Sequence, residues 1–117
     1  MPRIESYGFG RMVVDGEEYT RDLVISWKGV ENSSWWRKEG HALHLEDLRD
    51  VIERTEPEVL VVGTGYYGFM EVREEVREYL RERGIELVAG KTGEVYEKFN
   101  ELVERGARVL GAFHLTC

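Results

Sequence analysis

The sequence predicts an α/β domain of three layers, in which helices cover both faces of a central sheet. Three observations support this fold class. Apolar runs alternate with amphipathic segments from residue 59 onward, Glu-Arg-Gly precedes two of the later strands, and an Asp-Gly pair interrupts β-prone residues near the start. Alternating strands and helices pair in parallel through right-handed crossovers. We expect residues 1–117 to form a single domain.

The first third of the chain predicts β-structure. Asp15-Gly16 lies between Met12-Val13-Val14 and Tyr19, and such a pair favours a hairpin turn because its central residues take a positive φ. Leu23-Val24-Ile25 predicts a further strand. The residues from 30 to 41 show no period, and we expect an irregular connection there.

Helical spacing begins after His44. Apolar residues recur on one face between Leu45 and Ile52, with charged residues on the other. We expect this helix to end at Thr55-Glu56-Pro57, because a proline disfavours helical backbone in the residue before it.

The second half predicts a βαβαβ unit with nearly continuous apolar strands, as is typical of parallel strands buried on both faces. Gly84 and Gly106 suit the left-handed residue that ends a helix. In chain order we expect a strand at 59–62, a helix at 72–83, a strand at 85–89, a helix at 94–105 and a strand at 108–113.

Composition excludes several function classes. Sixteen Lys and Arg residues against 23 Asp and Glu residues give a formal net charge of −7, which argues against general binding to nucleic acids or anionic membranes. No apolar run reaches the roughly 20 residues of a membrane span, and Met1–Ser6 lacks an apolar signal core. The single cysteine, Cys117, cannot form an internal disulfide. We therefore expect a cytoplasmic protein.

The balance of amide residues indicates adaptation to heat. Gln is absent, and Asn occurs only at Asn32 and Asn100, while Arg and Glu are abundant. High temperature favours ion-pair networks and disfavours amides that deamidate. We expect a thermophilic source.

The segment Gly63-Thr64-Gly65-Tyr66-Tyr67-Gly68 matches the dinucleotide-binding pattern of a strand, a glycine-rich turn and a helix. The ribose-binding acid is missing, however, because the next strand ends at Val88-Ala89-Gly90-Lys91. Tyr66 and Tyr67 also crowd a turn that should approach phosphate closely. We expect no bound cofactor, and a tight strand-to-helix loop explains the glycines equally well.

Gly90-Lys91-Thr92 looks like the end of a P-loop, but Ile85 occupies the position of the required earlier glycine. Thr92 is a candidate cap for the helix that follows. We expect no nucleotide hydrolysis from this segment.

The C-terminus carries His114 and Cys117 after the last strand. Residues three apart on a strand point to opposite faces, which opposes a Cys-His catalytic pair. His41, His44 and His114 have no recognised metal-ligand spacing. We therefore expect no metal and assign no catalytic residue.

Parallel strands bring their carboxyl ends to one edge, where open α/β sheets bind ligands. This edge unites the loop from Gly63 to Gly68 with Lys91 and His114. The candidate ligand-binding residues for a small anion are Gly63, Thr64, Gly65, Tyr66, Tyr67, Gly68, Lys91 and His114.

Trp35, Trp36 and Arg37 form an aromatic and basic run. Trp and Arg are favoured anchors at protein interfaces, so these three residues are a candidate interaction surface. The alternative is structural: one tryptophan fills the end of the core and the other covers the irregular connection.

Several segments in order resemble a small α/β domain family of unknown function, which includes the adipogenesis-associated domain protein and the mitochondrial complex I assembly factor 3. The resemblance implies a central mixed sheet, additional N-terminal β-structure and no established catalytic activity. The chain is similar to a free-standing prokaryotic member. The matching segments are Ile4 to Gly10, Trp36-Arg37, Leu60 to Gly65, Gly84-Ile85, Thr92, Asn100-Glu101-Leu102, Arg108-Val109 and His114 to Cys117.

We expect a non-enzymatic interaction or assembly module whose partner is another protein or a second copy of the chain. The alternative is a protein or enzyme that binds a small anion at the carboxyl edge. In that alternative Thr64, Tyr66, Tyr67 and Lys91 position the anion and His114 transfers a proton.

Overall fold

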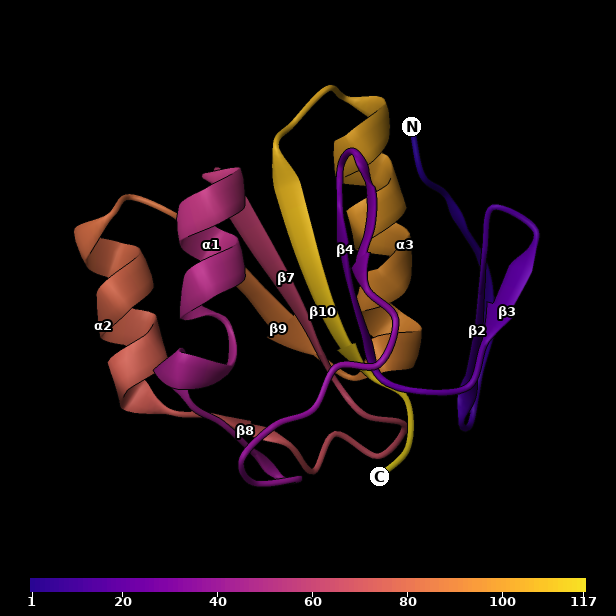
Figure 1. Ribbon diagram of the computed structural model, residues 1–117, viewed down its shortest axis with the longest axis horizontal. Helices are drawn as coiled ribbons and strands as arrows, with labels where there is room; N and C mark the ends of the chain where they lie inside the picture. The colour runs from indigo at the N-terminus through magenta and orange to yellow at the C-terminus, as the bar shows by residue number, and fades with distance from the viewer.

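The computed structural model describes residues 1–117 (Figure 1). Strands dominate the first third, and helices alternate with strands afterwards. The elements in chain order are β1 (Ile4–Gly8), β2 (Arg11–Val14), β3 (Glu17–Tyr19), β4 (Leu23–Ser26), β5 (Gly29–Asn32), β6 (Ala42–Leu43), the 3₁₀ helix η1 (Leu45–Asp47), α1 (Arg49–Thr55), β7 (Val59–Thr64), β8 (Glu71–Val72), α2 (Glu74–Glu82), β9 (Glu86–Gly90), α3 (Thr92–Glu104) and β10 (Val109–His114).

The central sheet has five strands in the order β5-β4-β10-β7-β9. Strands β10, β7 and β9 are parallel, whereas β4 pairs antiparallel with β10 and β5 pairs antiparallel with β4. This confirms the mixed central sheet and the βαβαβ unit expected for the second half.

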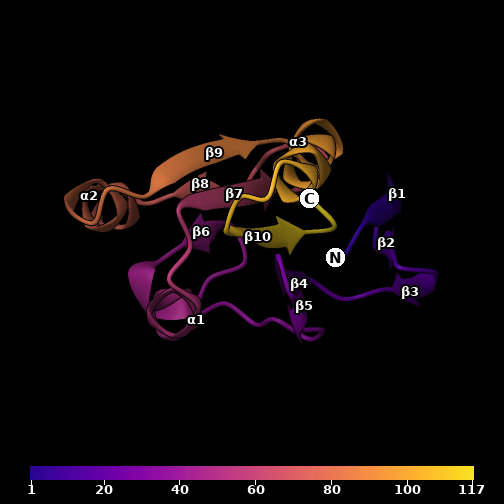
Figure 2. The ribbon, with the colours of Figure 1, turned by 90° about the horizontal axis from the view of Figure 1, so that it is seen from above.

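Two layers cover this sheet. Helices α1 and α2 lie on one face, while α3 and the three-stranded sheet β1-β2-β3 lie on the other (Figure 2). Successive strand residues point to opposite faces, so every position in β4, β7 and β10 is buried. Leu60, Val62, Leu110 and Ala112 pack in the apolar cluster of α1 and α2, and Val59, Val61, Val109 and Phe113 pack in that of α3 and β1–β2.

The N-terminal hairpin is confirmed. Asp15 and Gly16 have φ values of 51° and 81°, and they connect β2 to β3. The amide of Asn100 on α3 holds β1 through two hydrogen bonds, accepting from Ile4 N at 2.8 Å and donating to Ile4 O at 2.7 Å. These bonds fix the hairpin sheet against the main body.

Two predicted helices were wrong at their first turns. The helix expected from Val72 begins at Glu74, because Glu71–Val72 forms β8 and pairs in parallel with β6. The helix expected after His44 is divided into η1 and α1 at Leu48, whose φ and ψ of −129° and −10° are not helical. The predicted end at Thr55 is correct, since Glu56 takes a left-handed conformation.

Candidate functional site

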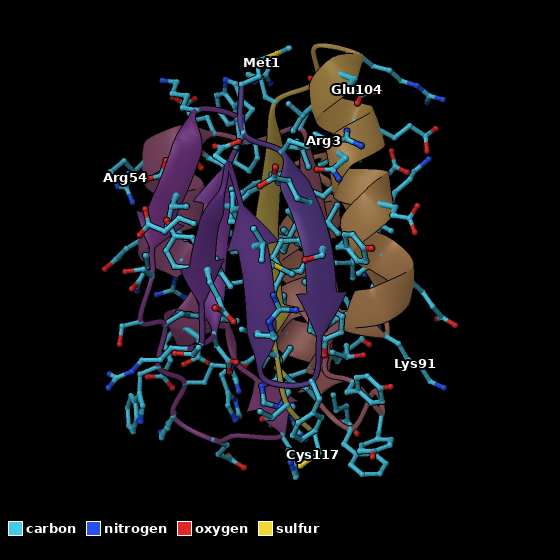
Figure 3. The ribbon with its side chains drawn as sticks, turned by 90° about the vertical axis from the view of Figure 1, so that its right-hand side faces the viewer. Met1, Arg3, Arg54, Lys91, Glu104 and Cys117 are labelled. Carbon is cyan, nitrogen blue, oxygen red and sulfur yellow. The ribbon has the colours of Figure 1, made fainter.

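The carboxyl ends of β7, β9 and β10 meet at one edge of the molecule. The loop after β7, the start of α3 and the C-terminal segment lie together there, and the predicted ligand-binding residues from Gly63 to Gly68, Lys91 and His114 are all at this edge. Lys91 extends outward at the same end of the molecule as Cys117 (Figure 3). The topology thus brings together residues up to 54 positions apart in the chain.

The three glycines of the loop are required by contacts within the protein. A Cβ at Gly63 would lie 2.6 Å from Thr92 Oγ1, and one at Gly65, where φ is +107°, would lie 2.6 Å from Thr116 O. Gly68 has a φ of +78°, and its Cβ would lie 3.1 Å from Lys91 Cγ. The space that a pyrophosphate takes in a dinucleotide site is filled here by the chain itself.

Thr92 joins the parts of this edge. Its hydroxyl donates to His114 O at 2.7 Å and accepts from Gly65 N at 3.0 Å. The predicted capping role of Thr92 was wrong, because Lys91 is the residue before the helix and Thr92 is the first helical residue. The hydroxyl is buried between α3, β7 and β10. It instead forms hydrogen bonds with the Gly65 N–H and the His114 carbonyl, which have no partner within a helix or sheet.

Several backbone N–H groups at this edge are used within the protein. Tyr66 N donates to Thr116 O at 2.8 Å, Met70 N donates to Thr64 O at 3.1 Å, and Thr92 N donates to Gly65 O at 3.1 Å. Phosphate cradles need several free N–H groups that point at the ligand. Lys91 forms no ion pair, but the N–H groups of Gly65, Tyr66 and Thr92 are committed within the protein rather than to an anion.

The partly buried Asp22 and the buried Arg37 and His114 form a cluster beneath this edge, which we call the Asp22 cluster. One Asp22 oxygen lies 2.7 Å from both Arg37 Nη1 and His114 Nδ1, and the other accepts from Leu115 N at 2.8 Å. Burial alone would raise the pKa of Asp22, but the hydrogen bonds from His114, Leu115 and Arg37 outweigh it and hold that pKa below its usual value. The charged Asp22 carboxylate therefore links the start of β4 to the connection around Arg37 and to the end of β10.

His114 Nδ1 lies 2.7 Å from Asp22 Oδ2 and 3.0 Å from Arg37 Nη2, so this nitrogen is engaged within the cluster. Nε2 is buried without a protein partner, as is Arg37 Nε. His114 lines none of the larger surface hollows. A general base must reach its substrate, so this geometry supports a structural role for His114.

The structure separates the three residues of the predicted interaction surface. Trp35 is buried in the core, and its indole N–H donates to Asp47 O at 3.2 Å. The guanidinium of Arg37 lies 4.8 Å from the Trp35 ring and is buried against Asp22, to which it donates. Trp36 alone projects outward, with 80% of its surface exposed.

Four exposed aromatic residues gather at the carboxyl edge, and we call Phe9, Tyr66, Tyr67 and Phe69 the aromatic surface. Their exposed fractions lie between 47% and 60%. The ring centroids of Tyr66 and Tyr67 are 5.1 Å apart, those of Phe9 and Tyr66 are 5.6 Å apart, and those of Tyr67 and Phe69 are 5.8 Å apart. Large aromatic groups are thus presented together rather than singly.

The aromatic surface is held firmly from below. Gly10 N donates to Leu115 O at 2.9 Å, which fixes the turn that carries Phe9, and Tyr66 N is fixed to Thr116 O. Tyr7 supports Tyr66 with a centroid distance of 6.2 Å and donates its hydroxyl to Leu115 O at 2.8 Å. Sequence reasoning missed Phe9 and Phe69, although each is an apolar residue next to a glycine.

Two further properties concern membranes and metals. None of the helices has both the length and the apolar character needed to cross a membrane. No group of three or more His, Cys, Asp or Glu side chains is arranged to hold a metal ion.

A family model described as a protein of unknown function (DUF498/DUF598) matches residues 4–114. The chain belongs to this family. The resemblance inferred from the segments between Ile4 and Cys117 is thereby confirmed at the level of a small domain family of unknown function.

Solved structures of similar proteins share the fold. The conserved hypothetical protein PH1505 from Pyrococcus horikoshii OT3 is 28% identical, with a TM-score of 0.83, and the match covers 98% of this chain and 99% of that one. The protein MT938 is 26% identical over the whole of both chains, with a TM-score of 0.79.

A protein from Bartonella henselae described as an outer membrane protein shares the fold at 24% identity and a TM-score of 0.80, with 97% of this chain and 94% of that one covered. None of the three descriptions names an activity. Function in this family must therefore be argued from the surface of the molecule.

Proposed function

We propose that this protein is a non-catalytic binding module that docks a protein partner through the aromatic surface. The observation that carries the proposal is the contiguous exposure of Phe9, Tyr66, Tyr67 and Phe69 on a firmly held edge. Aromatic side chains supply large contact area at low conformational cost and dominate the energetics of many protein interfaces. Exposed apolar patches of this kind mark interaction sites more often than accidents of folding.

The shape and charge of this edge favour a protein over a small ligand or a nucleic acid. The hollow beside Phe69 and Gly90 is shallow and open, whereas small-molecule sites enclose most of their ligand. The net charge of −7 opposes phosphate backbones. An exposed aromatic surface suits a partner that presents apolar side chains of its own.

The alternative of a small-anion site or an enzyme at the same edge has less support. Lys91 is present, but the N–H groups of Gly65 and Tyr66 are already bonded within the protein. His114 lies under the loop with its free nitrogen buried. Both features favour a rigid docking surface over a catalytic or anion-binding site.

We place this binding activity in the cytoplasm of a heat-adapted organism. The free thiol of Cys117 suits a reducing compartment. Exposed ion pairs such as Arg3–Glu104 and Arg105–Glu101, at 2.8 Å and 2.6 Å, contribute more to stability at high temperature.

Affinity capture from the native host with chemical crosslinking tests the proposal. Wild type is compared with the double variant Tyr67→Ser/Phe69→Ser, and Trp36→Ser is the matched control because it removes an exposed aromatic ring outside the aromatic surface. We expect a specific protein to be captured by wild type and Trp36→Ser and lost from the double variant. Equal capture by all three proteins would overturn the role of the aromatic surface.

A further inference from the structure

Strand β9 is the last strand of the central sheet, and no other strand lies beyond it (Figure 2). It pairs with β7 on one side only, in register from Val59–Glu86 to Gly63–Gly90. An edge strand presents unpaired backbone groups that can accept another strand. The outer edge of β9 is therefore available to another strand unless some other feature of the protein blocks it.

The backbone groups that β9 turns outward can be identified. Glu86 N donates to Glu58 O, and Gly90 O accepts from the Thr64 hydroxyl, so residues 86 and 90 direct their backbone groups toward β7. Alternate residues of a strand direct their N–H and C=O groups to opposite sides. Leu87 and Ala89 therefore carry the free N–H and C=O pairs, at the spacing that an added extended chain would match.

The opposite edge of the sheet is protected, and β9 is not. Strand β5 pairs with β4 through a register shift between Val24 and Ile25, and its Glu31 is held by Arg54 at 2.6 Å. Bulges and charged side chains are devices that prevent an edge from accepting another strand. In β9 the ladder is regular, the strand contains no proline, lysine or arginine, and its one charged residue, Glu86, lies at the first position.

An exposed arginine without an ion pair, Arg77, lies beside this edge. Two shallow hollows flank β9, and Arg77 of α2 borders both of them. Arg77 is exposed and forms no ion pair, whereas Arg81 lies 3.7 Å from Glu74 and Arg73 lies 3.3 Å from Glu71. One hollow reaches from Ala89 and Gly90 to Phe69. The free edge is thus continuous with the aromatic surface.

We propose that β9 accepts an extended acidic segment of the protein partner as an additional strand. The segment pairs with the N–H and C=O groups of Leu87 and Ala89, places a carboxylate against Arg77, and continues toward Phe69. Main-chain pairing supplies affinity in this binding mode, and side-chain contacts supply specificity. This inference rests on the proposed function and names the partner's chemistry and the way it binds.

A second copy of the chain is a less suitable occupant. Strand β9 of a second copy would bring one carboxylate, Glu86, together with a second unpaired Arg77. An acidic segment brings carboxylates without that added positive charge, so it complements Arg77 better.

The test is selection of binding peptides from a displayed library of random short sequences, followed by affinity measurements with synthetic copies. Ala89→Pro removes one outward N–H, and proline is tolerated at such a position of an edge strand. Ala89→Ser retains the N–H and is its matched control. Arg77→Glu reverses the local charge, and Arg77→Lys retains it.

We expect the selected peptides to be acidic and extended, and Ala89→Pro to weaken their binding roughly tenfold or more, which corresponds to the loss of one hydrogen bond with its donor. Arg77→Glu should weaken the acidic peptides to a similar extent, whereas Ala89→Ser and Arg77→Lys should bind nearly as wild type does. Hydrogen exchange should slow at the amides of Leu87 and Ala89 in the complex.

Several outcomes overturn the inference. These are a selection that yields no binding peptide, binding that Ala89→Pro leaves unchanged, or a concentration-dependent dimer of the free protein that Ala89→Pro abolishes. Loss of binding in Tyr67→Ser/Phe69→Ser with full binding in Ala89→Pro would contradict the inference and leave the aromatic surface supported. The reverse pattern would support strand addition and contradict the aromatic surface.

Discussion

Asp22 Oδ2 lies 2.7 Å from His114 Nδ1, although 92 positions separate the two residues in the sequence. Asp22 immediately precedes β4, and His114 ends β10. Arg37 reaches the same carboxylate oxygen at 2.7 Å. The pair therefore fixes the end of the sheet over which the aromatic surface is built.

Replacing Asp22 with Asn should lower the free energy of unfolding by about 3 kcal/mol, because Arg37 would remain buried without its counter-charge. Urea denaturation measures this change. Glu78→Gln, an exposed position without an ion pair, is the control and should change the unfolding free energy by less than about 0.5 kcal/mol. Equal stability of Asp22→Asn and wild type would contradict the stabilising role of the Asp22 cluster.

The Asp22 cluster also predicts that the stability of the protein depends on pH. The pKa of Asp22 is lower in the folded than in the unfolded state, so its stabilising effect is present above the unfolded pKa of about 3.9 and is lost as pH falls through the folded pKa. Unfolding measured from neutral to acidic pH should show a steeper loss for wild type than for Asp22→Asn. Parallel curves for the two proteins would exclude this linkage.

Tyr7 should ionise late. Burial raises its pKa to about 12, so the stability that it contributes is present below the unfolded pKa of about 10 and is lost as pH rises toward 12. Absorbance titration of tyrosinate should reveal a transition near that pH in wild type, and Tyr7→Phe should remove it. A titration curve that is unchanged in this range in Tyr7→Phe would refute the assignment.

Gly65→Ala should destabilise the protein by about 2–4 kcal/mol, because the residue has a φ of +107° and its added Cβ would lie 2.6 Å from Thr116 O. Gly84→Ala is the matched control: its φ is +69°, but no atom lies within 4 Å of the added Cβ, and we expect a cost of about 1 kcal/mol. Thermal and urea unfolding compare the two. Similar costs for both variants would mean that the C-terminal segment does not pack on Gly65.

The melting temperature should exceed the range of about 45–65 °C that is usual for mesophilic domains. Ion pairs such as Arg54–Glu31 and the pairs of Lys98 and Arg105 with Glu101 contribute more as temperature rises. Circular dichroism at low and high salt measures this, and added salt should lower the melting temperature because it screens exposed pairs. Melting within the mesophilic range would contradict heat adaptation.

The main elements could be predicted because their signals are local. Apolar runs at β7 and β10 and Asp15-Gly16 in the hairpin act through neighbouring residues. Strand β8 could not be predicted, since Glu71–Val72 is extended only because it pairs with β6, almost thirty residues earlier. The position of Thr92 was misjudged for a similar reason, because its hydroxyl is used by Gly65 and His114 from other strands.

The edge that carries the candidate site could be predicted, but its surface could not. Parallel topology alone brings the loop from Gly63 to Gly68 toward Lys91 and His114. The burial of Trp35 and the exposure of Phe9 and Phe69 depend on how the irregular connections fold back onto the edge, and no period in the sequence encodes this. The glycine pattern marks a tightly packed loop rather than a nucleotide site, because Gly63 packs on Thr92, Gly65 on the C-terminal segment and Gly68 on Lys91.

The most direct test of the account is the affinity between the purified protein and its captured partner, measured by calorimetry for wild type and for Tyr67→Ser/Phe69→Ser. Both side chains are more than half exposed, so the variant should unfold at nearly the same denaturant concentration as wild type. We expect the variant to bind the partner at least about tenfold more weakly than wild type does. Equal affinity in a fully folded variant would contradict the central claim that the aromatic surface is the docking site.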